Sequence, residues 1–111
     1  MNTLFMNAGR LRTELKLEAL QPQPDDIGGY SETWHEIALI WGQIRAITSS
    51  SRFLAQRWHP ETTHRITIRF SEAIQAGMRL RKDKRIFHID AIQDADETRR
   101  YQICFVREET S

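Results

Sequence analysis

Four histidines are the residues of this chain that most readily bind a metal ion. They are His35, His59, His64 and His88. Zinc sites join histidine to cysteine or carboxylate ligands at short, regular spacings, whereas these histidines follow no such spacing and Cys104 is the only cysteine. The sequence therefore predicts no metal site. We expect His64 and His88 to be hydrogen-bonded or partly exposed residues of β-strands.

Catalytic combinations of residues are not recognisable either. Cys104 alternates with apolar neighbours between Ile103 and Val106, which is typical of a small core residue rather than a nucleophile. The acidic turn at residues 94–97 is followed by two arginines and resembles solvated turn charges more than an acid-base pair. No glycine-rich phosphate loop or serine-histidine-aspartate set is suggested by local context. We expect neither an enzyme nor a cofactor.

Basic side chains gather in two places where the chain could contact phosphate or line a DNA channel. The candidates are Arg65 and Arg69 on one predicted strand, and Arg79, Arg81, Lys82 and Lys84 around a predicted hairpin that also holds Arg85. Such a cluster either contacts phosphate or forms the solvated rim that keeps a sheet edge from pairing. Phe87 is the one aromatic residue near the hairpin, which argues against a platform for single-stranded bases. The formal charge of +1 gives nucleic-acid binding no further support.

The elements that position these residues are predicted to be β-strands. Apolar and polar residues alternate from Leu11 to Ala19 and from His64 to Phe70, which is the pattern of half-buried strands. Further strands are predicted at residues 33–47, 78–81, 85–92 and 101–107. Six strands with one short helix predict a mainly β fold, either a small barrel or a sandwich.

Prolines and glycines mark the breaks between these strands. Residues 22–29 hold Pro22, Pro24, Gly28 and Gly29, and predict a long exposed turn in which the two glycines adopt positive φ. Gly42 lies inside the second predicted strand and indicates a bulge or a sharp bend there.

At 111 residues the chain fits a single domain, which we place at residues 1–111 with flexible ends at 1–9 and 108–111. A chain of this length buries roughly two-thirds of its unfolded surface and folds without a staple. One cysteine excludes a disulfide framework and favours a reducing cytoplasm. Residues 1–9 are too short and mixed for a signal peptide, and no apolar run approaches the roughly 20 residues that span a bilayer. We expect no membrane contact.

Several segments, taken in order, follow a recognisable pattern. They are Leu11-Arg12, Asp26 to Trp34, Ile40 to Ile44, Thr63 to Arg69, Gly77 to Leu80, Arg85 to Ile89 and Ala91-Ile92. This pattern closely resembles the head-tail joining, or head-closure, proteins of tailed bacteriophages and prophages over about residues 11–108. The most specific parts are the segment from Gly28-Gly29 to Trp34 and the run Thr-His-Arg-Ile-Thr-Ile at residues 63–68.

The resemblance implies a small β-barrel with an inserted loop or helix. It implies a structural subunit of the head-tail connector that docks as a ring beneath the portal, helps to close the DNA-filled head and receives the tail. The implied partners are a portal or adaptor protein, a tail-completion protein and further copies of the chain, with packaged double-stranded DNA nearby. The implied location is the virion, and the host cytoplasm before assembly. The matched fold markers are Gly28, Gly29, Trp34, Trp41, His64, Ile66, Ile68, Phe87 and Ile89, of which both tryptophans, the three isoleucines and the phenylalanine are expected in the core.

A short amphipathic helix is predicted at residues 49–58, because serines that can cap a helix precede it and Pro60 stops it. This helix either covers the open end of the barrel or, as the resemblance implies, contacts a neighbouring subunit or lines the channel. The candidate interface residues are Arg52, Phe53, Leu54, Arg57 and Trp58. The alternative function is a small barrel that binds nucleic acid directly through Arg65, Arg69 and the basic hairpin.

Overall fold

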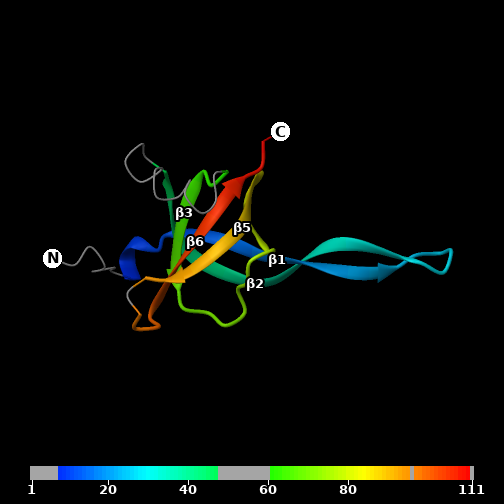
Figure 1. Cartoon of the computed structure of the whole chain (residues 1–111), viewed down its shortest axis with the longest axis horizontal. Coiled ribbons are helices and arrows are strands. Elements are labelled where there is room, and N and C mark those ends of the chain that lie inside the picture. The colour runs from blue at the N-terminus through cyan, green and yellow to red at the C-terminus, as the bar shows by residue number, and fades with distance from the viewer. Residues whose placement is uncertain (1–7, 48–60, 96, 111) are drawn as a thin grey trace.

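The computed structural model describes residues 8–47, 61–95 and 97–110. In these residues six strands pair antiparallel into one closed barrel with the order β1-β2-β3-β6-β5-β4 (Figure 1). A 3-10 turn, η1 (Ala8–Arg10), precedes β1 (Thr13–Pro24), β2 (Tyr30–Ala46), β3 (His64–Arg69), β4 (Arg79–Lys82), β5 (Arg85–Asp94) and β6 (Tyr101–Glu108). The predicted mainly β fold is confirmed, and it is a barrel rather than a sandwich.

The predicted helix at residues 49–58 lies outside the described residues, together with its five candidate interface side chains. The described part of the chain contains no α-helix. It also holds no helix with the length and apolar character needed to cross a membrane.

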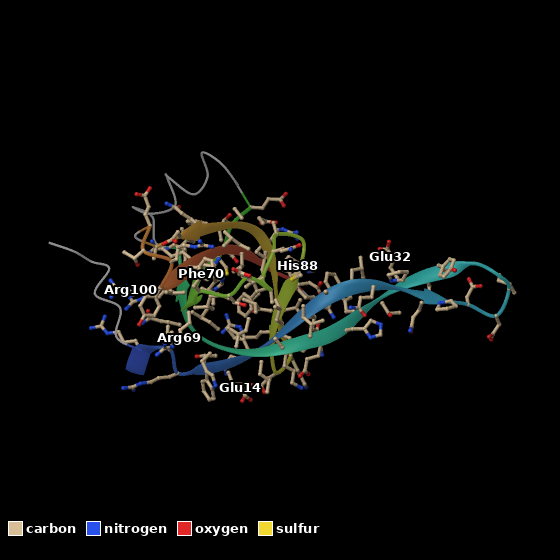
Figure 2. All side chains as sticks on the ribbon, turned by 90° about the horizontal axis from the view of Figure 1, so that it is seen from below. Glu14, Glu32, Arg69, Phe70, His88 and Arg100 are labelled. Carbon is tan, nitrogen blue, oxygen red and sulfur yellow. The ribbon has the colours of Figure 1, made fainter. Side chains whose placement is uncertain are left out.

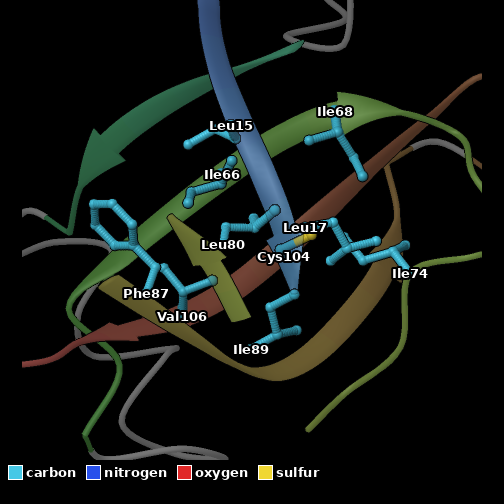
Figure 3. Close-up of a cluster of buried hydrophobic side chains, with 10 residues drawn as sticks. All are labelled: Leu15, Leu17, Ile66, Ile68, Ile74, Leu80, Phe87, Ile89, Cys104 and Val106. Atoms are coloured by element: carbon cyan, nitrogen blue, oxygen red, sulfur yellow. The ribbon is translucent and has the colours of Figure 1, made fainter. Parts of the chain in front are cut away.

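The core lies inside the barrel, because every second side chain of each strand points inward. Figure 3 shows this buried cluster: Leu15, Leu17, Ile66, Ile68, Ile74, Leu80, Phe87, Ile89, Cys104 and Val106. Burial of one large aliphatic or aromatic side chain contributes about 1.5–3 kcal/mol. A cluster of this size therefore contributes much of the free energy that holds the six strands together.

Four of the six residues predicted as core belong to this cluster, but the two tryptophans do not. Trp34 is only half-buried, and 53% of Trp41 is exposed. Trp41 lies between Ile40 and Gly42, which face Leu15 and Ile68 on the neighbouring strands. Alternation along β2 therefore directs Trp41 to the outer surface, and its placement in the core was wrong.

The first two strands are longer than predicted and leave the barrel as a projecting hairpin (Figure 1). β1 pairs with β4 only from Lys16 to Glu18, and β2 pairs with β3 only from Gly42 onward. Residues 19–35, which we call the arm, therefore pair only with each other, and the molecule reaches 58 Å along its longest axis. Prolines are tolerated in such strands because the outer edges need no ladder hydrogen bonds. For this reason Pro22 and Pro24 did not end β1 as predicted.

An irregularity in the pairing of β1 with β2 marks the base of the arm. Leu17 lies opposite Ala38 while Glu18 lies opposite Glu36, so that Ile37 is an extra residue in β2. Such a bulge increases the local twist and bends the hairpin. The bulge predicted at Gly42 is therefore found at Ile37 instead.

Gly42 allows β1, β2 and β3 to approach one another closely. A Cβ atom at this position would lie 3.0 Å from the carbonyl oxygen of Thr67 and 3.1 Å from side-chain atoms of Leu15 and Ile68. Only glycine leaves room for β1, β2 and β3 to pack this closely.

The tip of the arm is a compact loop built around Asp25. The Asp25 carboxylate accepts hydrogen bonds from the backbone amides of Ile27 at 3.0 Å and Gly29 at 2.8 Å. Gly28 has a φ of 85°, as predicted, whereas Gly29 does not adopt positive φ.

Candidate interaction surfaces

The arm exposes apolar side chains that contribute nothing to the barrel core. Ile27 is 92% exposed and Tyr30 is 74% exposed, and Leu20 adds a third exposed apolar side chain. Isolated exposed apolar residues are ordinary, but these three share one hairpin that projects from the molecule (Figure 2). The arm is therefore a candidate docking element.

All charged side chains from residue 17 to residue 44, a stretch that includes the arm, are acidic. No lysine or arginine occurs between Lys16 and Arg45. The carboxylates in this stretch are Glu18, Asp25, Asp26, Glu32 and Glu36. All except Glu18 are exposed to solvent.

A buried ion pair holds the base of the arm against the barrel. Arg79 on β4 donates a hydrogen bond of 2.6 Å from Nε to Glu18 on β1, and both side chains are buried. The Arg79 guanidinium also lies over the Trp34 ring, 4.3 Å from its centroid. The second oxygen of Glu18 lies 3.5 Å from Nε of Arg81. Two arginines of β4 thus meet at the Glu18 carboxylate, and Trp34 of the arm packs on one of them.

This geometry corrects the expected role of Arg79. Its guanidinium is directed into the protein and bound to Glu18, so that it cannot face phosphate. Arg81 shares the same carboxylate and is half-buried. In the turn that follows, Lys82 pairs with Asp83 and Lys84 is exposed. Arg79 is therefore withdrawn from the basic surface expected at the β4-β5 hairpin, whereas Arg81, Lys82 and Lys84 remain exposed or partly exposed.

A second group of charges joins β5, β6 and the residue after β6. Arg85 donates hydrogen bonds of 2.8 and 3.1 Å to Glu108, and His88 lies 2.9 Å from Glu109. The hydrogen bond from Arg85 lowers the pKa of Glu108, and contact with His88 lowers the pKa of Glu109. These contacts link the end of β6, which extends to Glu108, and the residue after it to β5.

His64 packs inside this group. Its ring lies edge-on to Phe87 with centroids 5.4 Å apart, and its Nδ1 is 2.8 Å from Oγ1 of Thr63. Burial lowers the pKa of His64, although the nearby Glu108 carboxylate opposes this effect. His64 is therefore a hydrogen-bonded strand residue, and His88 is partly exposed, as predicted.

The outer surface of β2 and β3 carries three arginines, and we call this surface the basic face. Arg45 lies directly opposite Arg65 in the β2-β3 ladder, and Arg69 follows on β3. Like charges at directly opposite positions are destabilising. Among the described residues, no acidic side chain forms an ion pair with any of the three. The expected Arg65 and Arg69 are thus brought onto one surface, separate from the β4-β5 hairpin.

A groove of about 480 Å³ borders the basic face at Arg69. Its other walls are Leu11, residues 38–41 of β2, Phe70 and Ser71. Trp41 and Leu39 line it and are more than half exposed. On the outer side of β1, Glu14 lies opposite Trp41 and contributes one carboxylate nearby. The groove is thus apolar with charged margins.

The chemistry of the remaining candidates is limited. Cys104 is completely buried, and this burial raises the pKa of its thiol to about 12, so it is the core residue that the sequence predicted. No group of three or more potential metal ligands is found among residues 8–47, 61–95 and 97–110.

Sequence reasoning missed Glu18, Arg45 and the exposed side of β2. The absence of lysine and arginine between Lys16 and Arg45 could have predicted an acidic segment from the sequence alone. The pairing of Arg45 with Arg65 depends on strand register, which no local pattern in the sequence reports.

Comparison with known proteins identifies similar structures and the family of the chain. A comparison with curated protein sequences gives no match. A solution structure of a Shigella flexneri 2a protein is 26% identical, with a TM-score of 0.76 and coverage of 93% of this chain and 96% of that one. A chain from the virion of a native gene transfer agent particle is also 26% identical, with a TM-score of 0.64 and coverage of 89% and 94%. The family model described as phage head completion protein matches residues 6–109, and the chain belongs to this family of structural phage proteins.

Proposed function

We propose that the chain is a head-tail connector subunit that docks as a ring beneath the portal, helps to close the DNA-filled head and provides a surface for the tail. The observation that carries this proposal is the family match over residues 6–109. The similar gene transfer agent chain, which comes from a virion, supports a place in an assembled particle. Its partners are then a portal or adaptor protein, a tail-completion protein and further copies of itself.

The physical character of the described surfaces fits a protein of this kind. The arm exposes Ile27 and Tyr30, and β2 exposes Leu39 and Trp41. Exposed apolar groups with charged margins are typical of interaction sites between proteins. We keep the segment with Arg52, Phe53, Leu54, Arg57 and Trp58 as a second proposed contact on the basis of the sequence alone.

Deletion of the gene from an inducible phage tests the proposal. We expect DNA-packaged heads and complete tails that remain separate, and heads that lose DNA on storage. Electron microscopy counts the joined particles, and a plasmid copy of the wild-type gene should restore them. Normal numbers of joined particles after deletion would overturn the proposal.

Direct binding of nucleic acid is the alternative, and the observation that favours it is that the three arginines of the basic face have no ion-pair partner among the described residues. A protein that neutralises several phosphates loses affinity steeply as salt is added. Titration of the purified chain with double-stranded DNA at several salt concentrations measures this dependence. The burial of Arg79 removes one of the cations on which the alternative relied.

A further inference from the structure

The arm and the basic face carry complementary properties, although they belong to the same chain. The arm presents Asp26 and Glu32 beside Ile27 and Tyr30, and it contains no lysine or arginine. The basic face presents arginines beside the apolar groove that Trp41 and Phe70 line. Each surface offers the charge that the other lacks, together with apolar area to bury.

The two surfaces cannot meet within one molecule. Figure 2 shows Glu32 on the projecting arm, whereas Arg69 and Phe70 lie on the side of the barrel away from the arm tip. The arm is also held in its projecting direction at its base, by the Glu18-Arg79 ion pair and the packing of Trp34 on Arg79. Complementary surfaces at opposite ends of one chain satisfy each other only between copies.

We propose that the arm of one subunit docks on the basic face and groove of the next copy of this chain. Ile27 and Tyr30 pack against Trp41 and Phe70, while Asp26 and Glu32 approach Arg65 and Arg69. A contact between two different surfaces is head-to-tail, and it generates a ring when the rotation between copies closes. The inference deepens the proposed function, on which it rests, by naming the contact that builds the ring.

The basic face explains why a charged partner is needed. Arg45 and Arg65 repel each other across the ladder in the free subunit. An acidic hairpin laid over them relieves this repulsion. Electrostatic complementarity of this kind also fixes the register of a contact and suppresses wrong partners.

Paramagnetic relaxation between two differently labelled chains tests the contact even when it is weak. A nitroxide is attached to Gln23→Cys on the exposed arm of an unlabelled chain, since the buried Cys104 thiol does not compete for the reagent. This chain is mixed at about millimolar concentration with ¹⁵N-labelled wild-type chain. We expect broadening of the amide signals of Trp41, Arg69 and Phe70 in the ¹⁵N chain. Absence of broadening, or broadening confined to other surfaces, would overturn the proposal.

Charge reversal makes the test specific. The change Arg65→Glu with Arg69→Glu in the ¹⁵N chain should abolish the broadening, and Asp26→Lys with Glu32→Lys in the spin-labelled chain should restore it. The matched control is Lys84→Glu, an exposed basic residue away from the basic face, which should change nothing. Amide spectra report whether each variant is folded. Failure of the reversed pair to restore the signal would count against the assigned surfaces.

Docking of the arm on another component of the head is the main competing outcome. In that case the two-chain mixture shows no broadening, and a photo-cross-linker at position 23 captures that component in assembled particles. The connector function is separable from this result, because gene deletion measures it without reference to the arm. Normal joining by a chain with Asp26→Lys and Glu32→Lys would overturn the arm contact and leave the proposed function standing.

Discussion

Glu18 joins β1 to β4 at the base of the arm. Its carboxylate is buried, accepts a 2.6 Å hydrogen bond from Arg79 and lies near Arg81. Removing one partner of a buried ion pair leaves the other charge without compensation. The arm base is therefore sensitive to single substitutions.

We predict that Glu18→Gln lowers the free energy of unfolding by about 3–5 kcal/mol, as is usual when a buried ion pair is broken. The control is Glu36→Gln, which removes the exposed partner of Lys16 across 3.9 Å and should cost less than about 1 kcal/mol. Urea denaturation measures both. Equal losses in the two variants would show that the buried pair does not stabilise the base.

His64 and Glu108 should make the barrel less stable in acid. The pKa of His64 is lowered by burial and the pKa of Glu108 by Arg85. The unfolded chain therefore binds more protons than the folded one, and stability rises with pH. The contribution of His64 to stability is complete above about pH 6.5 and is lost as the pH falls through the lower pKa of the folded state. The contribution of Glu108 is complete above about pH 4.5 and is lost in the same way at lower pH.

Urea denaturation midpoints measured at pH 7.5 and 5.5 separate the contribution of His64 to stability from that of Glu108. The wild-type midpoint should fall between these two values of pH, and His64→Gln should reduce that fall. His35→Gln on the arm is the control and should keep the wild-type difference. An unchanged pH dependence in His64→Gln would assign the effect to other groups.

At the scale of elements, the arm is separable from the barrel because it contributes no core residue. The core side chains of β1 end at Leu17 and the partly buried ones of β2 begin at Ala38. Trp34 of the arm contacts the barrel through Arg79 and His88. A shortened arm that keeps Trp34 should leave the barrel intact.

We predict that joining Gln21 to Thr33 through an Asn-Gly turn, in place of residues 22–32, leaves the urea midpoint nearly unchanged. These two residues are cross-strand partners, and a two-residue turn of this type matches the twist of a hairpin. The shortened chain should fail to join heads to tails in the deletion strain. A large loss of stability would show that the arm belongs to the folding unit.

Gly42 tests the close approach of the first three strands. We predict that Gly42→Ala costs about 1–3 kcal/mol, as is typical when a packed core is overfilled, because the new Cβ meets the backbone oxygen of Thr67 at 3.0 Å. Gly29→Ala is the control, since its Cβ meets only the end of the flexible Asp25 side chain. Thermal denaturation compares them, and equal midpoints would refute the packing argument.

The strands of the barrel were predictable where alternation was clear, but their partners were not. The run from His64 to Phe70 reads as β3 because one of its faces is apolar. The arm was missed because Pro22 and Pro24 read as strand breakers, and only the pairing partners reveal that they lie on free edges. The prediction that Trp41 lies in the core failed for a related reason. The face of β2 on which Trp41 lies depends on strand register rather than on the hydrophobicity of the residue.

At the scale of the whole molecule, charge is separated along the chain although the net charge is only +1. The arm is acidic, and three arginines without ion-pair partners among the described residues line the basic face. Overall charge therefore says little about what this molecule binds. The distribution favours attraction between copies in a fixed orientation.

The arm also separates the connector hypothesis from direct DNA binding, because its removal affects the two in opposite directions. Residues 22–32 include three carboxylates and no basic residue. If the basic face binds DNA, the shortened chain should bind it at least as tightly as the full chain, because negative charge has been removed. If the face receives the arm of another copy, the shortened chain should lose self-association instead.

Analytical ultracentrifugation at about millimolar concentration measures this self-association. The wild-type chain should associate, and the association should weaken as ionic strength rises from about 0.02 to 1 M, because the Debye length falls to about 3 Å over this range. Sedimentation of the shortened chain should be monomeric at both ends of that range. Association that persists without the arm would place the contact between copies elsewhere on the barrel.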